Sequence, residues 1–298
     1  MLQTFDERNR DLIVSVNGHL VHRDRAAISP FDSAVQGGDA VWEGLRLYQG
    51  KIFRLEEHLA RLRRSATALA FASVPSDEEI TGQIRAALRA NAMTDNVHIR
   101  LTLTRGVKIT SGMDPRLNQS GPTLIVLAEH KPPVYDQSGI TLITSSVRRP
   151  PPDCLDPKIH HNNLLSSILA KIEANVAGAD DAVMLDQRGF VAETNATHLF
   201  LVAGGRLATP APVACPEGIT RAAVLELAEG AGIGCDVGDL SLTQFYSADE
   251  VFVTGTMGGL TPVTAIDGRT IGGSPGPVTL RLTTLFADLT ACSGTPVA

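Results

Sequence analysis

The sequence predicts an α+β protein of two domains, and three observations lead to that expectation. At 298 residues the chain can bury a substantial core. Patterns typical of helices and of strands alternate along both halves. A proline-rich passage, "HKPPVYDQSG", separates those halves. We therefore expect a smaller N-terminal α+β domain over residues 1–128, a linker over 129–138 and a larger C-terminal domain over 139–298.

Composition and charge narrow the class of protein. An apolar fraction of 43% and a charged fraction of 19% are ordinary for a globular protein. The net charge of −6 provides no basic field for nucleic acid or an anionic membrane. No apolar run has the length of a transmembrane helix, and the opening "MLQTFDERNRDL" lacks the pattern of a signal peptide. The cysteines form no CxxC pair, so we expect a reduced, cytoplasmic compartment.

The N-terminal half contains two hairpin signals and two helices. Asn17-Gly18 and Gln49-Gly50 each separate two apolar runs, which is typical of a β-hairpin. Leucine and alanine recur every three or four residues in "LEEHLARLRRSATALAF", which predicts an amphipathic helix. A second helix is expected over residues 77–91, and strands are expected at "NVHIRLTLTRG" and "TLIVLAEH".

The C-terminal half continues with a strand, a helix and a strand hairpin. The strand is "GITLITSSV", and Arg148 and Arg149 after it are expected in solvent. The helix begins after Asn162 or Asn163, either of which could cap it, and carries one apolar stripe from Leu164 to Val176. Lys171 falls off that stripe and is expected in solvent. The hairpin runs through "DAVMLDQRGFVAETNATHLFLV"; a helix from Thr220 and the strand "EVFVTG" complete the pattern.

A lysine in a polar passage raises the question of function. Lys158 opens "KIHHNN", beside a turn predicted by Asp156-Pro157 and just ahead of the apolar helix. A lysine fixed there could serve as a nucleophile. A solvent-exposed lysine without a chemical role is the simpler reading of any single lysine, so the surrounding residues must decide.

Three other features suggest the chemistry. Glu193 lies in an otherwise apolar strand, where a carboxylate is costly without a cationic partner. Gly218, Ile219 and Thr220 begin a helix whose free N–H groups suit a phosphate. Thr256 lies in a second glycine turn after a strand. Neither GxxxxGK[ST] nor GxGxxG occurs, which argues against a nucleotide site. A reactive lysine, a buried carboxylate and a phosphate cradle are the parts that pyridoxal 5'-phosphate requires.

At these motifs the sequence resembles the fold-type IV, or class IV, pyridoxal-phosphate aminotransferases. Nearly the whole chain takes part, from "GGDAVWEGLRLYQGKIFRLEEHLARL" through "GITRAAVLELA" to "DEVFVTGTMGGLTPV". "KIHHNNLL" and "ETNAT" are most similar to the D-amino-acid-transaminase-like and branched-chain-aminotransferase-like branch. The resemblance implies a two-domain fold whose C-terminal domain is a pseudo-barrel, and a homodimer with active sites near the subunit interface.

The resemblance also implies a role for individual residues. Lys158 would form the Schiff base with the cofactor and move the substrate's α-proton. Glu193 would face the pyridine nitrogen. The remaining cofactor-binding residues implied are Arg61, Asn163, Ile219, Thr220 and Thr256. The substrate-binding residues implied are Arg100, Met257, His98 and, across a dimer interface, Arg25. No metal site is expected at His160 and His161, because adjacent side chains of an extended segment point apart.

Departures from the family pattern affect the substrate more than the cofactor. Asn163 stands where many relatives have a tyrosine that contacts the cofactor, and the branched-chain pattern YxRP reads "HIRL". We expect transamination between a D-amino acid such as D-alanine and 2-oxoglutarate or pyruvate. L-branched-chain transamination is the alternative, and an aminodeoxychorismate lyase is the third candidate. A non-catalytic cofactor-binding protein would not need the lysine and the carboxylate together.

Overall fold

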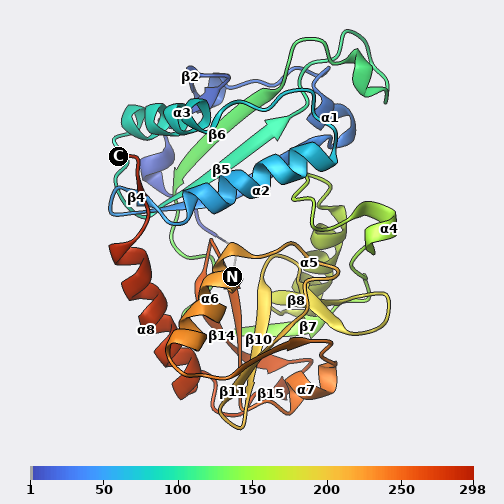
Figure 1. Cartoon of the computed structure of the whole chain (residues 1–298), viewed down its shortest axis with the longest axis vertical. Helices are drawn as coiled ribbons and strands as arrows, with labels where there is room; N and C mark the ends of the chain where they lie inside the picture. The colour runs from blue at the N-terminus through green and yellow to red at the C-terminus, as the bar shows by residue number, and fades with distance from the viewer. Residues whose placement is uncertain (1–2) are drawn as a thin grey trace. The chain divides into compact units, whose positions relative to one another are not determined.

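The computed structural model describes residues 3–298 (Figure 1). The chain divides into two compact units, each built from helices and a sheet, so the expected mixture of helix and strand is confirmed. The N-terminal unit comprises residues 3–132, 159–163 and 290–298. The C-terminal unit comprises residues 133–158 and 164–289. The polar passage after Lys158 is therefore a short excursion, in which the chain leaves one unit and contributes five residues to the other.

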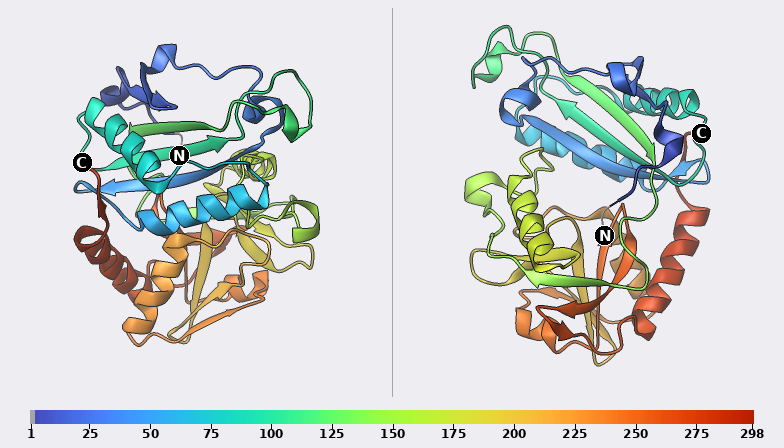
Figure 2. Two further views of the ribbon diagram at one scale, coloured as in Figure 1. Left: turned by 45° about the horizontal axis from the view of Figure 1, so that its top comes forward. Right: turned by 180° about the vertical axis from the view of Figure 1, so that it is seen from behind.

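A seven-stranded antiparallel sheet forms the N-terminal unit, in the order β16-β4-β3-β5-β6-β1-β2. Helices α2 and α3 lie over one face of this sheet (Figure 2), and their apolar side chains join those of the strands in one core. The strands are β1 Ile13–Val16, β2 His19–His22, β3 Ala40–Tyr48, β4 Lys51–Ile52, β5 Val97–Thr104, β6 Thr123–His130 and β16 Thr295–Pro296. The helices are η1 Glu7–Asn9, η2 Arg23–Arg25, α1 Ser33–Gly37, α2 Leu55–Ala68, α3 Asp77–Ala90 and η3 Pro115–Leu117.

The C-terminal unit is built on a nine-stranded sheet that curls into a half-barrel. Its order is β12-β11-β10-β13-β14-β7-β8-β9, and β15 pairs with β14. The strands are β7 Ile140–Thr144, β8 Asp181–Leu185, β9 Val191–Thr194, β10 His198–Ala203, β11 Arg206–Pro210, β12 Cys235–Gly238, β13 Glu250–Gly255, β14 Gly259–Ile266 and β15 Arg269–Thr270. The helices are α4 Pro152–Leu155, α5 Leu165–Ala177, α6 Ile219–Gly230, α7 Leu242–Tyr246 and α8 Pro277–Cys292.

The predicted local structure of the N-terminal unit is confirmed. Asn17 and Gln49 adopt positive φ angles of 50° and 47°, and each is followed by a glycine at positive φ, as a tight hairpin requires. The apolar stripe of α2 is buried against the sheet. Helix α3 begins with a capping box, in which Ser76 and Glu79 bond each other's backbone N–H groups.

Helix α5 packs through small residues and not through its predicted apolar stripe. Leu165, Ile168, Leu169, Ile172 and Val176 are 50–85% exposed, whereas Ala170 and Ala174 on another face are fully buried. Neither Asn162 nor Asn163 caps the helix; its N-cap is Leu164, which makes no side-chain cap bond. The small alanines allow the helix backbone to approach the sheet closely, so the large apolar residues remain on the outer side. In residues 3–298 no helix has the length and apolar character needed to cross a membrane.

Candidate functional site

Lys158 is the last residue before the chain leaves the C-terminal unit. Its backbone N–H donates to Asp156 Oδ1 at 2.9 Å, which closes the expected turn at Asp156-Pro157. The side chain is exposed, while Pro157 beside it is buried. Burial raises the pKa of the Cys215 thiol, and Lys158 is one of the cations near enough to act against this rise, so Lys158 lies in the same part of the unit as Cys215. Lys158 is thus an accessible amine on a fixed turn.

Glu193 lies in strand β9 and is 7% exposed. Its Oε1 forms an ion pair with Arg149 Nη2 at 2.8 Å, so the cationic partner expected for this buried carboxylate is present. Arg149 is itself 8% exposed, and its Nε donates to the backbone oxygen of Ala214 at 3.2 Å. The expectation that Arg149 lies in solvent is therefore wrong, because the guanidinium is needed to compensate the charge of Glu193.

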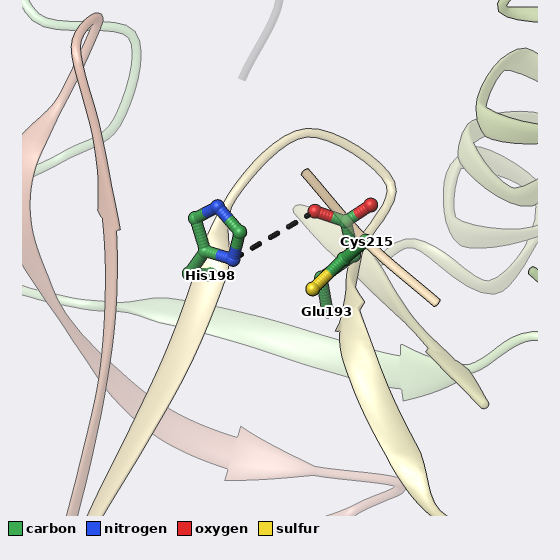
Figure 3. Close-up of side chains that lie close together, drawn as sticks. All are labelled: Glu193, His198 and Cys215. Carbon is green, nitrogen blue, oxygen red and sulfur yellow. Dashed lines mark ion pairs between the residues drawn. The ribbon is translucent and has the colours of Figure 1, made fainter. Parts of the chain in front are cut away.

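Glu193, His198 and Cys215 lie close together at the joined ends of β9 and β10 (Figure 3). His198 Nδ1 is 3.9 Å from Glu193 Oε2, and the candidate ligand atoms of all three residues lie within 4.8 Å of one another. This set could bind a metal ion in principle. However, burial raises the pKa of the Cys215 thiol, which Glu193 raises further, and Arg149 already balances the carboxylate. We therefore interpret the group as a polar cluster around Glu193.

The helix start predicted to bind phosphate borders this cluster. Helix α6 begins at Ile219 with Gly218 as its N-cap, and Thr220 is buried. A Cβ atom on Gly218 would lie 2.3 Å from the His198 ring, so only glycine fits against His198 here. His198 consequently links the carboxylate of Glu193 to the N-terminus of α6, where free N–H groups favour an anion.

The second predicted turn also reaches the same end of the sheet. Thr256 and Met257 follow β13 directly, and both are half-buried. A Cβ atom on Gly255 would lie 3.2 Å from Thr197 Cγ2, which places this turn against the β9–β10 connection. The sequence features Lys158, Glu193, Gly218–Thr220 and Thr256 therefore belong to one unit. Glu193 and Gly218 lie against His198, and Gly255 lies against the neighbouring Thr197.

The N-terminal unit has its own buried carboxylate, which the sequence did not single out. Glu43 in β3 is fully buried and accepts hydrogen bonds from Arg61 Nε at 2.8 Å and Nη2 at 2.7 Å. His58 Nδ1 is 2.6 Å from the same carboxylate, and His160 Nδ1 is 3.3 Å from it. Burial acts to raise the pKa of Glu43, but Arg61 and His160 hold it well below the usual range. Arg61, the expected phosphate ligand, is thus held by Glu43.

Residues 159–163 dock on the edge of β3. His161 pairs with Val41 as an isolated bridge, and the Trp42 backbone N–H donates to the His160 backbone oxygen at 2.9 Å. The His160 ring stacks on Trp42 with ring centres 4.1 Å apart. The two histidines therefore have different surroundings, as expected for adjacent residues of an extended segment. Asn163 is exposed, and its Nδ2 donates to the Gly38 oxygen at 3.1 Å.

Arg100 and His98 lie on one face of the N-terminal sheet. The Arg100 guanidinium is 3.5 Å from the centre of the Trp42 ring, and its Nη2 donates to Asn162 Oδ1 at 3.0 Å. His98 is 7% exposed and pairs in register with Arg46 of the neighbouring strand. Among residues 3–298, His98 Nδ1 and Arg46 Nη1 have no hydrogen-bond partner. Burial lowers the pKa of His98 to about 3 and that of Arg100 to about 10.

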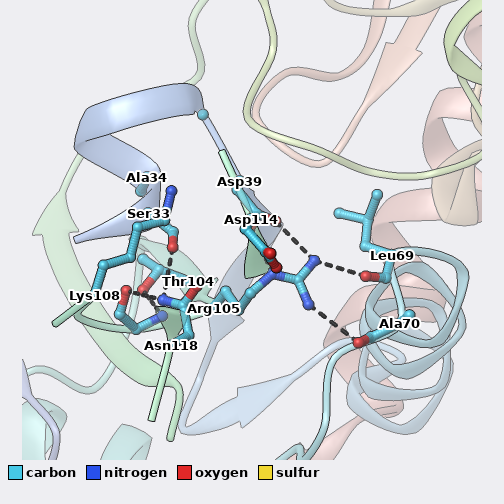
Figure 4. A network of polar contacts seen from close by, with 12 residues as sticks. Ser33, Ala34, Asp39, Leu69, Ala70, Thr104, Arg105, Lys108, Asp114 and Asn118 are labelled. Carbon is cyan, nitrogen blue, oxygen red and sulfur yellow. Dashed lines mark hydrogen bonds and ion pairs between the residues drawn. The ribbon is translucent and has the colours of Figure 1, made fainter. Parts of the chain in front are cut away.

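Arg25 and Arg105 differ in their exposure and in their contacts. Arg25 is exposed in η2. Arg105 binds both Asp39 oxygens, at 2.6 and 3.1 Å, and the backbone oxygens of Leu69 and Ala70 (Figure 4). Arg105 therefore anchors the base of the loop over residues 105–121 to the end of α2.

Sequence reasoning missed Glu43, Arg46, Arg149 and His198. The signal that identified Glu193, a charged residue within an apolar strand, is equally present for Glu43 in "AVWEGLRLY". Arg149 and His198 carry no such signal, because their importance depends on Glu193 lying beside them.

Comparisons with known proteins agree with this geometry. A family model described as amino-transferase class IV matches residues 40–266. The chain belongs to the class IV aminotransferase family. It is 56% identical over 97% of its length to a branched-chain-amino-acid aminotransferase-like protein 2 of Arabidopsis thaliana, and spans only 52% of that protein. This chain thus spans about half the length of the plant relatives that it matches.

Other relatives have a length closer to that of this chain. A putative branched-chain-amino-acid aminotransferase of Methanocaldococcus jannaschii is 41% identical, with 93% of this chain and 96% of the relative covered. A D-alanine aminotransferase of Bacillus licheniformis is 32% identical, with 92% and 96% covered. The crystal structure of a T.th. branched-chain amino acid aminotransferase complexed with N-(5'-phosphopyridoxyl)-L-glutamate matches with a TM-score of 0.86, at 34% identity and 94% coverage of both chains. The predicted family and its fold-type IV architecture are confirmed.

Proposed function

We propose that this protein is a pyridoxal-phosphate-dependent aminotransferase that exchanges an amino group between an L-branched-chain amino acid and 2-oxoglutarate. The observation that supports pyridoxal-phosphate chemistry is the presence in one unit of an accessible lysine, a buried carboxylate and a glycine-initiated helix start. The branched-chain substrate is proposed from the relatives with that name. The site fits the cofactor, because each polar group of pyridoxal phosphate has a complementary group in that unit. Lys158 suits the aldehyde, Glu193 suits the protonated ring nitrogen, and the N–H groups at the start of α6 suit the phosphate.

The residues of the C-terminal unit would divide the work as follows. When bound, pyridoxal phosphate withdraws electrons from the substrate's α-carbon. The Lys158 amine would hold the cofactor and would carry the α-proton. Glu193 would keep the ring nitrogen protonated, and Arg149 beside it would favour the ionised carboxylate that this role requires. The α6 N–H groups at Ile219 and Thr220, with the Thr256 hydroxyl, would bind the phosphate.

Residues of the N-terminal unit complete the proposal. Arg61, oriented by Glu43, is the proposed guanidinium ligand of the phosphate. Asn163 is the proposed amide donor to the cofactor. Both roles rest on family likeness, since Arg61 and Asn163 lie in the motifs "HLARL" and "KIHHNN" that resemble those of the family.

Three nitrogen-bearing side chains on one sheet face, those of His98, Arg46 and Arg100, support a dicarboxylate as the substrate that accepts the amino group. His98 and Arg46 are buried and each has a nitrogen without a partner in the described chain, and Arg100 lies on the same face. Buried donors of this kind are costly unless a ligand satisfies them. The second carboxylate of 2-oxoglutarate would do so, and Met257 would line the substrate side of the turn in the C-terminal unit.

D-alanine transamination is the second candidate function. It is favoured by the relationship to the Bacillus licheniformis enzyme and by His98 in place of the tyrosine of the branched-chain pattern. The distinguishing experiment is to mix the holoenzyme separately with L-leucine, L-glutamate and D-alanine and follow its visible absorption. Loss of the band with both L-amino acids supports the first candidate, and loss with D-alanine alone supports the second.

A lysine variant tests the common chemistry. Lys158→Ala should abolish the visible band of the bound cofactor and the activity, whereas Lys51→Ala, in the β4 hairpin, should retain both. A wild-type protein that forms no visible band with pyridoxal phosphate would overturn both candidate functions.

We also propose a homodimer that uses the exposed face of α5. The stripe Leu165, Ile168, Leu169, Ile172 and Val176 carries no charge and recurs at helical spacing. An isologous interface places the same stripe of two copies against each other, so an uncharged stripe complements itself. Ile168→Glu with Ile172→Glu should convert a dimer to a monomer in sedimentation, whereas Leu280→Glu on α8 should not. Arg25 is the proposed substrate contact across a dimer interface.

A further inference from the structure

Tyr135 lies against the turn that carries Thr256 and Met257. A Cβ atom on Gly258 would be 3.0 Å from Tyr135 Cδ2 and 3.5 Å from its Cε2, so the ring packs directly on the turn backbone. Next to it, the Val134 N–H donates to the Met257 oxygen at 3.3 Å. The segment that begins the C-terminal unit therefore supports this turn through one backbone hydrogen bond and one aromatic ring.

The phenol of Tyr135 extends from the turn to strand β8. Its hydroxyl donates to Asp181 Oδ2 at 2.5 Å, and Asp181 is only 1% exposed. The Thr194 hydroxyl donates to the same oxygen at 3.5 Å. Because Thr194 directly follows Glu193, a chain of contacts connects the Gly258 turn to the end of the strand that carries the proposed partner of the ring nitrogen.

A second set of contacts connects Thr194 with Gly255, at the other end of the same turn. The hydroxyls of Thr194 and Thr197 are 2.7 Å apart, and the Thr197 N–H donates to Thr194 Oγ1 at 2.9 Å. The Thr197 methyl group lies 3.2 Å from the position of a Cβ on Gly255. The turn is thus held from Gly255 by Thr197 and from Gly258 by Tyr135.

The surroundings of Tyr135 keep its phenol protonated, so that it remains a hydrogen-bond donor to Asp181. Burial, with Asp181 beside it, raises the pKa of Tyr135 well above its usual value, so the phenol keeps its proton at neutral pH. Lys171 Nζ lies 3.7 Å from Asp181 Oδ1 and supplies a positive charge beside the buried carboxylate. The Lys171 side chain is 38% exposed, as expected of a lysine off the apolar stripe, and it also has a carboxylate partner that the sequence did not predict.

We propose that Tyr135 is a positioning residue that fixes the Gly255–Gly258 turn relative to Glu193. The inference rests on the proposed function, in which Glu193 contacts the ring nitrogen and Thr256 the phosphate of one rigid cofactor. A rigid ligand binds well only if the protein groups at its two ends are held at a matching separation. Loosening the turn should therefore weaken binding of the cofactor without removing any group that contacts it.

The test compares two tyrosines in the same unit. Tyr135→Phe removes only the hydroxyl that binds Asp181. Tyr246→Phe is the matched control, because the Tyr246 hydroxyl donates to Asp267 Oδ2 at 2.7 Å. Loss of one hydrogen bond to a carboxylate corresponds to roughly a tenfold effect. We expect Tyr135→Phe to raise the Kd of the apoprotein for pyridoxal phosphate about tenfold, and Tyr246→Phe to change it less than about twofold.

Two further measurements separate positioning from general stability. The thermal midpoint of the apoprotein should fall by a similar amount in both variants, and the 31P NMR line of the bound cofactor should shift or broaden only in Tyr135→Phe. A Kd of Tyr135→Phe within about twofold of wild type, or an equal change in both variants, would overturn the proposal.

A glycine variant keeps the proposal testable if Tyr135→Phe folds poorly. Gly258→Ala places a methyl group against the Tyr135 ring and should weaken cofactor binding through the same contact. The effects of Gly258→Ala and Tyr135→Phe should be less than additive when combined, because both act on one turn. Full additivity would contradict a shared role. Failure of wild-type protein to bind the cofactor would instead contradict the proposed function itself.

Discussion

Each unit contains a buried carboxylate on a strand, with an arginine and histidine beside it, and the two are held differently. Glu43 has 0% exposure and four polar contacts between 2.6 and 3.3 Å, from Arg61, His58 and His160. Glu193 forms a short ion pair with Arg149 at 2.8 Å and a longer one with His198 at 3.9 Å. A carboxylate enclosed by short contacts stabilises the fold, whereas a carboxylate at a strand end beside helix and turn backbone is suited to a ligand.

The sharpest way to test this contrast is to neutralise Glu43. Glu43→Gln leaves the Arg61 guanidinium buried without its counter-charge, which should lower the free energy of unfolding of the apoprotein by about 3–5 kcal/mol. Urea unfolding can be followed by the fluorescence of Trp42, the only tryptophan, whose ring stacks on His160. A loss below about 1 kcal/mol would mean that Glu43 is not the centre of this cluster.

Removing the charge of Glu193 should lower activity more than it lowers stability. Glu193→Gln keeps the shape of the side chain and leaves Arg149 with its bond to the Ala214 oxygen, so the apoprotein should lose only about 1–2 kcal/mol. The activity of the cofactor-loaded protein should fall by about 10²-fold or more, because the ring nitrogen loses its anionic partner. If Glu193→Gln destabilised the protein as strongly as Glu43→Gln while retaining activity, the two carboxylates would have the same structural role.

His98 should make the stability of the protein depend on pH. Burial lowers its pKa to about 3, while in the unfolded chain it titrates near about 6.5. The unfolded state therefore binds more protons between these values, so stability is complete above about pH 6.5 and falls as the pH is lowered toward 3. From pH 6.5 to 5 the loss should be about 1.5 kcal/mol in wild type compared with His98→Asn. Equal pH dependence in both proteins would contradict the burial of a neutral His98.

The spacing of residues in the sequence was sufficient to predict local structure and the contacts made within one helix or hairpin. The stripe of α2, the hairpins at Asn17 and Gln49 and the helix start at Gly218 follow from spacing and turn chemistry. Lys158 and Glu193 could be singled out because each residue type is unusual in its immediate surroundings. Family likeness then supplied what the pattern could not, namely the cofactor.

What could not be predicted depends on contacts between distant segments. Periodicity shows that Ile168 and Ile172 share a face of α5, but not that alanines on another face pack against the sheet. Arg149 looks like a surface residue until Glu193 is placed 2.8 Å from it. Composition could not predict that residues 159–163 belong to the other unit. This assignment depends on their contacts with β3 and α2, which are distant in sequence.

The smallest effect is expected for an exposed pair between Arg63, which lies on the same helix as Arg61, and Asp77 at the start of α3. Arg63 Nη2 lies 2.6 Å from Asp77 Oδ1, nearer than any Arg61–Glu43 contact, but their side chains are 35% and 52% exposed. Solvent screens such pairs, so Asp77→Asn should lower the free energy of unfolding by less than about 1 kcal/mol, and less still in high salt. Urea unfolding at two salt concentrations, beside Glu43→Gln, measures the difference. If Asp77→Asn cost as much as Glu43→Gln, short distance rather than burial would control the strength of these pairs.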